Sequence, residues 1–466
     1  MTSNCWRQYA NHNLFFASFF AVVLFLGPVL HLPAQENANG EAGNSEAANT
    51  EAKTVPFLRM LENPEAGSVV LQMAVRRFER TEKAGPVVTM FSAIHIGDQS
   101  FYEKLQKLLD EKDVVLFESV KPPGAGRPEH SLSGSDSSEL KIATTKMRMR
   151  LLAIAAMSFE RQNKKLPADM RELLDSVSGK LELYSSLLAK DGWGNEFIYS
   201  LLPESAPSTA PEKTSPKNRF EITSLGEDKA LGGEGAAADI LHSAQKPIST
   251  RDIPKEGDQG IQADLAQALG LVFQLDAMKH DKPNWRNSDL SMDQVQERLA
   301  ASGANGDELF KMLDGSSLQA GVLKLVLGLM KMMPSMQLPS KLMIMEVMSR
   351  ADQMMGSVPG TQKMMEVILK DRNKVVIDDL AAIIEREPEV KQIGIIYGGA
   401  HMPDLALSLQ KMGYKEASVE WLDAITVLLP QNPAERKQLE SMRNTIRRSM
   451  EQQLKQLQKR AATNRQ

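Results

Sequence analysis

Cysteine is nearly missing from this sequence of 466 residues, because its single cysteine, Cys5, stands before the apolar run near the N-terminus. If that run is removed as a signal, no thiol remains, which excludes disulfides, cysteine nucleophiles and zinc–thiolate sites. Histidine, aspartate and glutamate are then the side chains left as metal ligands. The sequence also lacks a Walker loop, a GxGxxG after a strand, an HExxH and a GxSxG. The nucleotide-binding, zincin and serine-hydrolase signatures that those patterns mark are therefore missing.

A large excess of charge of one sign is missing too. The formal net charge is -4, with 42% hydrophobic and 24% charged residues, which is typical of a folded protein. A nucleic-acid partner is not expected from these values, because no basic surface dominates the chain. The length exceeds what one hydrophobic core usually organises, so two or three domains are expected.

Residues 1–34 are predicted to form a targeting segment. Arg7 precedes the apolar run Leu14–Leu26, and Gly27 to Ala34 is typical of a cleavage region. An uncleaved membrane anchor is the alternative, because the apolar character continues through Leu32. Either interpretation predicts an exported protein, periplasmic or attached to the cell envelope. Residues 35–55 lack apolar periodicity and predict a disordered linker.

A strand–helix–strand pattern follows the linker. Ser68–Phe78 and Pro86–Ile94 predict strands, Gln99–Asp110 predicts an amphipathic helix, and Val114–Phe117 predicts a buried strand. Such a βαβ unit implies a parallel sheet, in which ligand sites lie beyond the carboxyl ends of the strands.

An insertion interrupts this domain. Polar, Pro- and Gly-rich boundaries flank residues 138–246, within which 141–161 predicts one long helix. The flanks, 56–130 and 250–430, then form one split domain, mainly helical after Ile261. The methionine-rich stretch 322–365 predicts a plastic helical core, or alternatively an adaptable hydrophobic groove or membrane-surface patch.

Residues 431–466 predict a basic amphipathic helix, with Asn432 as N-cap and Pro433 at its first position. Nine Lys and Arg stand against three Glu in this segment. Docking onto the domain, self-association and attraction to an anionic surface all remain open.

Three side chains that could bind one metal stand at expected strand ends. His95 follows the second strand, Glu118 directly follows Val114–Phe117, and His401 follows a strand and Gly398-Gly399. Two imidazoles and a carboxylate can hold a divalent transition metal with an open position for water, or Glu118 can act as general base. Arg372 and Asn373 could orient a carbonyl or stabilise an oxyanion. The alternative is structural: helix caps for the histidines, and a salt bridge for Glu118.

In order, these elements resemble the TraB/Tiki (GumN-like) family. The resemblance rests on Ser-Ala-Ile-His95-Ile-Gly, Val-Val-Leu-Phe-Glu118, Asp371-Arg372-Asn373 and Gly-Gly-Ala-His401. It implies a fold similar to ChaN-like and erythromycin-esterase-like proteins, and metal-dependent proteolysis through two Gly-x-x-His motifs. Ser92 stands where the first motif has glycine.

The insertion resembles the soluble part of the type II secretion major pseudopilin (G-type). The resemblance rests on Lys165-Leu-Pro, Asp191-Gly-Trp-Gly-Asn, Ile222-Thr-Ser-Leu-Gly-Glu-Asp and Gly232-Gly-Glu-Gly-Ala-Ala-Ala-Asp-Ile. It implies a long helix packed on a small antiparallel sheet, and a calcium loop. The residues placed on that loop are Leu225, Asp228, Glu234 and Asp239. Gly235 and Ala236 replace the expected pair of aspartates, so calcium binding is not expected.

The sequence therefore predicts an α/β fold, α+β over the whole chain, and three functions. The first is a metal-dependent hydrolase acting on a peptide or protein substrate. The second is a non-catalytic binding or regulatory protein on the same scaffold. The third is an interaction module at an envelope secretion complex, acting through the insertion. Fold analogy cannot choose among them, because function resides in the site.

Overall fold

The computed structural model describes residues 56–82, 84–132, 137–176, 184–203, 219–248, 260–303, 333–350 and 362–463. The predicted targeting segment, the linker and most of the methionine-rich stretch lie outside these residues. No helix within the described ranges is long and apolar enough to cross a membrane. The chain has a mixed α/β architecture, as predicted.

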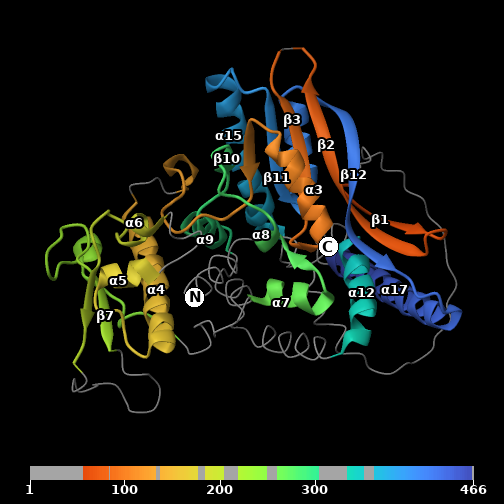
Figure 1. The fold of residues 1–466 in the computed structure, drawn as a ribbon. Helices are drawn as coiled ribbons and strands as arrows, with labels where there is room; N and C mark the ends of the chain where they lie inside the picture. The colour runs from red at the N-terminus through yellow and green to blue at the C-terminus, as the bar shows by residue number, and fades with distance from the viewer. Residues whose placement is uncertain are drawn as a thin grey trace.

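A central sheet organises the split domain (Figure 1). Its strand order is β1-β2-β3-β11-β5-β10, with β12 also paired to β2. The strands are β1 (Leu58–Asn63), β2 (Ser68–Arg80), β3 (Val87–Ala93), β5 (Val114–Phe117), β10 (Trp285–Asn287), β11 (Gln392–Gly398) and β12 (Tyr414–Leu428).

The predicted βαβ unit is present, as β3, α3 (Gln99–Asp110) and β5. Strand β11 lies between β3 and β5 and is parallel to both, while β10 extends the parallel part beyond β5. The expectation of a parallel sheet was incomplete, because β1, β2 and β12 form an antiparallel wing beside β3. Strand β12 was also missed. Six of its residues in succession, 415–420, are exposed, and this breaks the alternation that marks a strand.

Helices cover both faces of the parallel strands. On one face, Phe91, Val115 and Ile396 share a core with α3. On the other, Met90, Leu116 and Ile395 share a core with α15 (Arg372–Arg386) and α16 (Met402–Lys411). Burial on both sides explains why these strands are continuous apolar runs.

Several shorter elements complete the split domain. They are β4 (Ile96–Gly97), α7 (Gly260–Leu269), β9 (Val272–Phe273), α8 (Gln274–Ala277), α9 (Met292–Ala301), α12 (Gln337–Met348), α14 (Gln362–Met365), three 3-10 turns, η1 (Pro128–His130), η4 (Pro334–Met336) and η6 (Gly399–His401), and a π-helical turn, η5 (Glu366–Asp371).

The inserted unit, from α4 to β8, has the predicted arrangement. Helix α4 (Ser138–Asn163) packs on an antiparallel sheet of β6 (Ile198–Leu201), β7 (Phe220–Ser224) and β8 (Ile240–Leu241). The Ser137 side chain caps α4 by accepting a hydrogen bond from the Leu140 amide at 3.4 Å. Helices α5 (Met170–Ser176) and α6 (Ser185–Leu188) and the 3-10 turn η3 (Gly235–Ala237) complete the unit.

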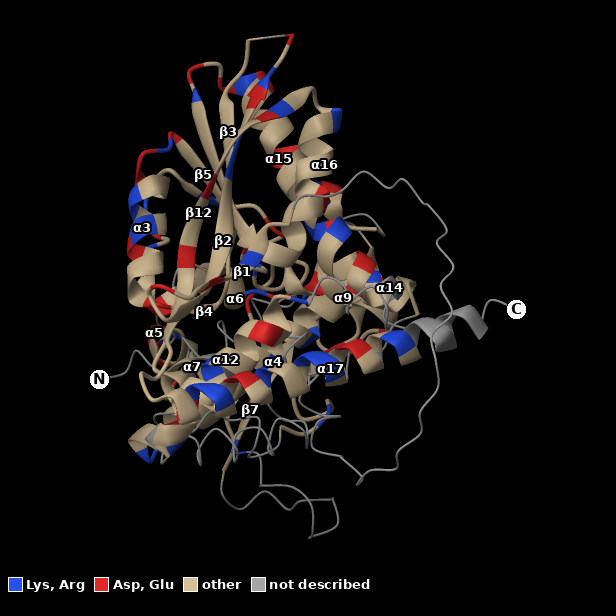
Figure 2. Cartoon of the chain, turned by 90° about the vertical axis from the view of Figure 1, so that its right-hand side faces the viewer, with Lys and Arg blue, Asp and Glu red and all other residues tan. Residues whose placement is uncertain are grey.

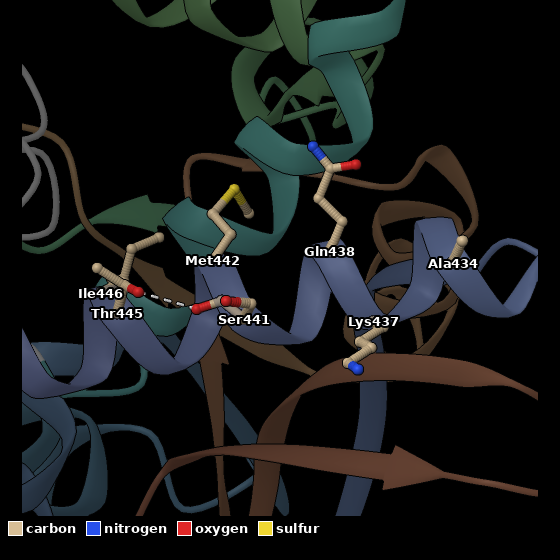
Figure 3. Close-up of a pocket in the computed structure, with 7 residues that line it drawn as sticks. All are labelled: Ala434, Lys437, Gln438, Ser441, Met442, Thr445 and Ile446. Carbon is tan, nitrogen blue, oxygen red and sulfur yellow. Dashed lines mark hydrogen bonds between the residues drawn. The ribbon is translucent and has the colours of Figure 1, made fainter.

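The C-terminal helix α17 (Pro433–Thr463) begins as predicted, because the Asn432 side chain accepts a hydrogen bond from the Ala434 amide at 2.9 Å. The helix docks onto α12, where Glu346 accepts hydrogen bonds from Arg443 and Arg447. Lys and Arg with a few acidic residues line α17 (Figure 2). A shallow groove of about 630 Å³ follows one side of α17, where Ala434, Gln438 and Met442 point the same way (Figure 3). No residue of the predicted site lines this groove.

Candidate functional site

The predicted site residues meet at one edge of the sheet. His95 lies two residues beyond β3, Glu118 directly follows β5, and His401 lies in the turn η6 after β11. Because these strands are parallel neighbours, their carboxyl ends reach the same edge. We call His95, Glu118, Asp289, Arg372 and His401 the charged site, and each of them is buried.

Glu118 lies at the centre of the charged site. Its Oε1 accepts a hydrogen bond from Arg372 Nη2 at 2.8 Å, and its Oε2 accepts one from the Gly398 amide at 2.7 Å. His401 Nε2 lies 3.5 Å from Oε1. Burial alone would raise the pKa of Glu118, but His401 and Arg372 together hold it well below the usual range. The side chain is therefore a carboxylate with little tendency to accept a proton.

Arg372 joins two carboxylates. Its Nε and Nη2 donate to Asp289 Oδ1 and Oδ2 at 2.9 and 2.7 Å, which is a bidentate pair, while Nη2 also donates to Glu118. Burial opposes the charged form, yet Asp289 and Glu118 raise the pKa of Arg372. Its Nη1 is buried with no hydrogen-bond partner among the described residues. The two N–H groups of Nη1 thus remain available to a bound group.

Sequence reasoning missed Asp289. It follows the short strand β10 just as Glu118 follows β5, and β10 is the parallel neighbour of β5. A carboxylate beyond a strand end was the available signal. The three residues of β10 lie in a section that was predicted to be mainly helical, so no strand end was expected before Asp289.

Asn373 fixes the orientation of His401. The Asn373 amide nitrogen donates to the His401 carbonyl at 3.1 Å and to Asp404 Oδ2 at 2.8 Å, which leaves Asn373 Oδ1 as an acceptor. His401 Nδ1 lies 2.7 Å from that oxygen, so we assign the proton to Nδ1. His401 Nε2 faces Glu118, whose Oε1 lies 3.5 Å away.

His95 is the neutral member of the charged site. Burial lowers its pKa to about 4, and the opposing effects of Glu118 and of a hydrogen bond with the Gln274 side chain do not offset this. Its carbonyl accepts a hydrogen bond from the Gln274 amide, at the start of α8, at 2.8 Å. The imidazole is therefore uncharged at neutral pH, the state that ligates metals.

Ser92 fits its position because Gly399 lies opposite. Ser92 is fully buried, and a Cβ added at Gly399 would lie 3.3 Å from Ser92 Oγ and 3.2 Å from the end of Met73. The close approach between the two strand ends thus depends on glycine at only one of the two motifs. The serine in place of glycine does not separate His95 from the other site residues.

The placement of Arg372 and Asn373 depends on a local irregularity. The π-helical turn Glu366–Asp371 directly precedes α15, which begins at Arg372. Such turns are rare and occur frequently at functional sites. Here the turn leads into two successive residues with different tasks, one holding Glu118 and one holding His401.

No group of three or more His, Cys, Asp and Glu side chains among the described residues is arranged to hold a metal ion. At the charged site, Arg372 donates to Glu118 Oε1, the oxygen that faces His401. Binding a metal between these two groups would require Arg372 to shift away from Glu118.

The predicted calcium-loop residues lie together in the inserted unit, away from the charged site. Asp228 Oδ1 accepts a hydrogen bond from the Ala230 amide and Asp239 Oδ2 accepts one from the Gly232 amide, both at 3.0 Å. Glu234 is exposed, and Leu225 is half-buried. One oxygen of each aspartate therefore holds the backbone of the loop itself.

Comparison with known proteins gives one match, to part of the chain. Residues 132–243 match the family model described as type II secretion system (T2SS), protein G. This match supports the resemblance that the motifs of the inserted unit indicate, and it covers less than a quarter of the chain. No curated protein and no solved structure matches. For the split domain, the TraB/Tiki resemblance therefore remains an expectation from its motifs.

Proposed function

We propose that this chain is a cell-envelope protein of the TraB/Tiki type whose charged site hydrolyses a peptide or protein substrate with a divalent metal. The observation that supports this best is the convergence of Glu118, Arg372, Asn373 and His401 at the carboxyl ends of parallel strands. Those side chains come from segments that the insertion separates in sequence. Open α/β sheets place their ligand sites at this edge.

The donor atoms suit a divalent transition metal in kind. His401 presents a buried Nε2, while its Nδ1 is held by the Asn373 amide oxygen, the outer-shell arrangement that orients ligating histidines. His95 is neutral, and Glu118 is ionised. We assign these three residues to the metal, which when bound would lower the pKa of a coordinated water.

Glu118, Arg372 and Asn373 have different proposed roles. The low pKa of Glu118 makes it a weak proton acceptor, so we assign it to holding the metal rather than to proton abstraction. Arg372 has a buried nitrogen, Nη1, whose two N–H groups could bind a substrate carbonyl or a developing oxyanion. Asn373 acts through His401 and is a positioning residue.

Metal analysis of the purified full chain tests this proposal. We expect about one transition-metal ion per chain, and loss of most of it in a His95→Ala/His401→Ala variant, because each imidazole supplies one ligand. A matched control replaces His280, which the resemblance does not include, by alanine. Equal metal content in the double variant and the control would remove the basis of the proposal.

A non-catalytic protein on the same scaffold is the alternative for the split domain. The bidentate pair of Arg372 with Asp289 can serve purely to join β10 to α15. In that case the double histidine variant and the wild type would both lack metal and peptidase activity.

The family match supports a second role, in secretion at the envelope, through the inserted unit. This role and hydrolysis can coexist, because the unit and the charged site are formed by different residues. A pull-down from envelope extract, comparing the full chain with a Trp193→Ala variant in the Asp191–Asn195 signature, tests the role. Recovery of secretion-system components that does not depend on an intact inserted unit would count against it.

A further inference from the structure

The inserted unit is not a separate body attached to the split domain by two linkers. Helix α4 contributes Met149, Leu152, Ala153 and Ala156 to a buried core that also contains residues of the split domain. The latter include Val120, Val295, Leu299, Val367, Ile368 and Val375. In Figure 1, α4 and α9 lie at the junction of the two parts, and their contact is direct.

A buried polar contact fixes α4 against α9. Thr144 Oγ1 donates to Asp293 Oδ2 at 2.9 Å, and Asp293 Oδ1 accepts a hydrogen bond from the Gly124 amide at 2.9 Å. Thr144 and Asp293 are both 4% exposed. One carboxylate thus joins α4, α9 and the loop that follows Glu118.

Arg148, one turn further along α4, makes a second buried contact. Its Nε donates to the Pro123 carbonyl at 2.9 Å, and its Nη1 donates to the Lys190 and Asp191 carbonyls, also at 2.9 Å. Gly124 lies so close that an added Cβ would be 1.9 Å from Arg148 Nη2. The guanidinium therefore ties the Trp-Gly signature turn of the inserted unit to the loop after Glu118.

The segments that α4 holds are the ones that carry the charged site. The loop at Pro123 and Gly124 begins at Glu118, and α9 begins three residues after Asp289. The turn η5, whose Val367 and Ile368 pack in the shared core, ends directly before Arg372. An ion pair between Arg298 of α9 and Asp371 of η5, at 3.4 Å, joins the last two segments.

We infer that the inserted unit holds the charged site in place. Its residues Thr144 and Arg148 are positioning residues for Glu118, Asp289 and Arg372. Three charged residues from different parts of the chain keep their mutual distances because α4 contacts the loop after Glu118 and also α9, which in turn contacts η5 next to Arg372. A partner that displaces α4 therefore alters the charged site. This inference goes beyond the proposed hydrolysis and does not depend on it.

Hydrogen exchange of the full chain tests the inference without any activity. We compare wild type with Thr144→Val, which replaces one hydroxyl by a methyl group, and with Arg148→Met. Removing one partner of a buried hydrogen bond should speed local opening about tenfold or more in peptides covering 114–124 and 366–373. The α3 peptide, 99–110, should keep its rate. Arg171→Ala, whose side chain in α5 is 90% exposed, should change neither.

Two results would overturn the inference. In the first, exchange rises within α4 while 114–124 and 366–373 keep their wild-type rates, so that the contacts merely hold the unit. In the second, α3 exchanges faster to the same extent as the site peptides, so that the whole domain loosens. If Arg148→Met does not fold, Thr144→Val alone decides between these results and the expected one.

Discussion

Replacing Arg372 by methionine should reveal how strongly the charged site depends on one guanidinium. The substitution keeps most of the side-chain volume and removes three hydrogen bonds, two to Asp289 and one to Glu118. Each carboxylate keeps one backbone donor, the Leu290 amide for Asp289 and the Gly398 amide for Glu118. In the variant both are buried carboxylates that have lost their hydrogen-bonded cation.

The magnitude follows from the cost of leaving such charges unpaired. Removing one partner of a buried ion pair typically destabilises a protein by about 3–5 kcal/mol. Protonation limits the cost, because neutralising a carboxyl with a pKa near 4 at pH 7 takes about 4 kcal/mol. We therefore expect Arg372→Met to lower the free energy of unfolding of the split domain by about 3–5 kcal/mol at pH 7.

The pH dependence gives this loss a signature. In the wild type the pKa of Glu118 is depressed, so its stabilisation is fully present above the unfolded pKa near 4.5 and is lost as the pH falls below it. In the variant the pKa of Glu118 rises, so protonation becomes easy at mildly acidic pH. The difference in stability between wild type and variant should therefore shrink as the pH falls from 7 toward 4.5.

Exchange of the β5 and β11 amides under increasing denaturant measures the stability of this domain separately from the rest of the chain. The double variant Arg372→Met/Asp289→Asn is the matched control, because removing charge on both sides should recover part of the loss. A cost below about 1 kcal/mol for the single variant, or a double variant less stable than the single one, would refute the reasoning.

Three further outcomes are expected. The pKa of His95 falls to about 4 in the folded chain, so between pH 6.5 and 4 the unfolded state binds a proton that the folded state does not. The wild type should therefore lose roughly 3 kcal/mol of stability over that range through His95, and acid titration of a His95→Gln variant should show a loss smaller by that amount. Asn373→Ala should cost about 1–3 kcal/mol and, by nitrogen NMR, should remove the preference of His401 for a proton on Nδ1. The melting temperature of the chain should scarcely change when calcium replaces chelator, because Asp228 and Asp239 each hold a backbone amide; a rise of many degrees would contradict this.

The sequence predicted those parts of the fold that local periodicity specifies. The apolar run Val114–Phe117 forms a strand with the same bounds as predicted, and α3 buries Phe101, Tyr102, Leu105 and Leu109 as its spacing indicates. The parallel strands are continuous apolar runs because both of their faces are covered. For these elements, the order of apolar and polar residues along the sequence was sufficient to predict the structure.

Pairing between distant segments could not be predicted in the same way. Nothing in residues 84–120 shows that a strand from near residue 395 lies between β3 and β5. Strand β12 owes its conformation to pairing with β2 along nearly its whole length, while its own side chains at 415–420 are mostly polar and exposed. Tertiary pairing, rather than propensity, decides such strands.

The candidate site shows the same division. The sequence places His95, Glu118 and His401 after expected strands. This predicted that they lie at one edge, because a parallel sheet brings the carboxyl ends of its strands together. The partners that set their electrostatics, Asp289 for Arg372 and Asn373 for His401, depend on contacts between elements.

The shared core of α4 with α9 and η5 is the least predictable feature, and it changes how the insertion should be understood. Boundary signals at both ends of residues 138–246 predict an insertion, but they do not predict which of its faces are buried. In the structure, Val120, Val295 and Val367 share one core with α4, and Asp293 accepts a hydrogen bond from Thr144. A sequence shows where a chain leaves and re-enters a domain, whereas it does not show which faces meet afterwards. The coupling between the inserted unit and the charged site is therefore a property of packing, and substitutions at Thr144 and Arg148 measure it directly.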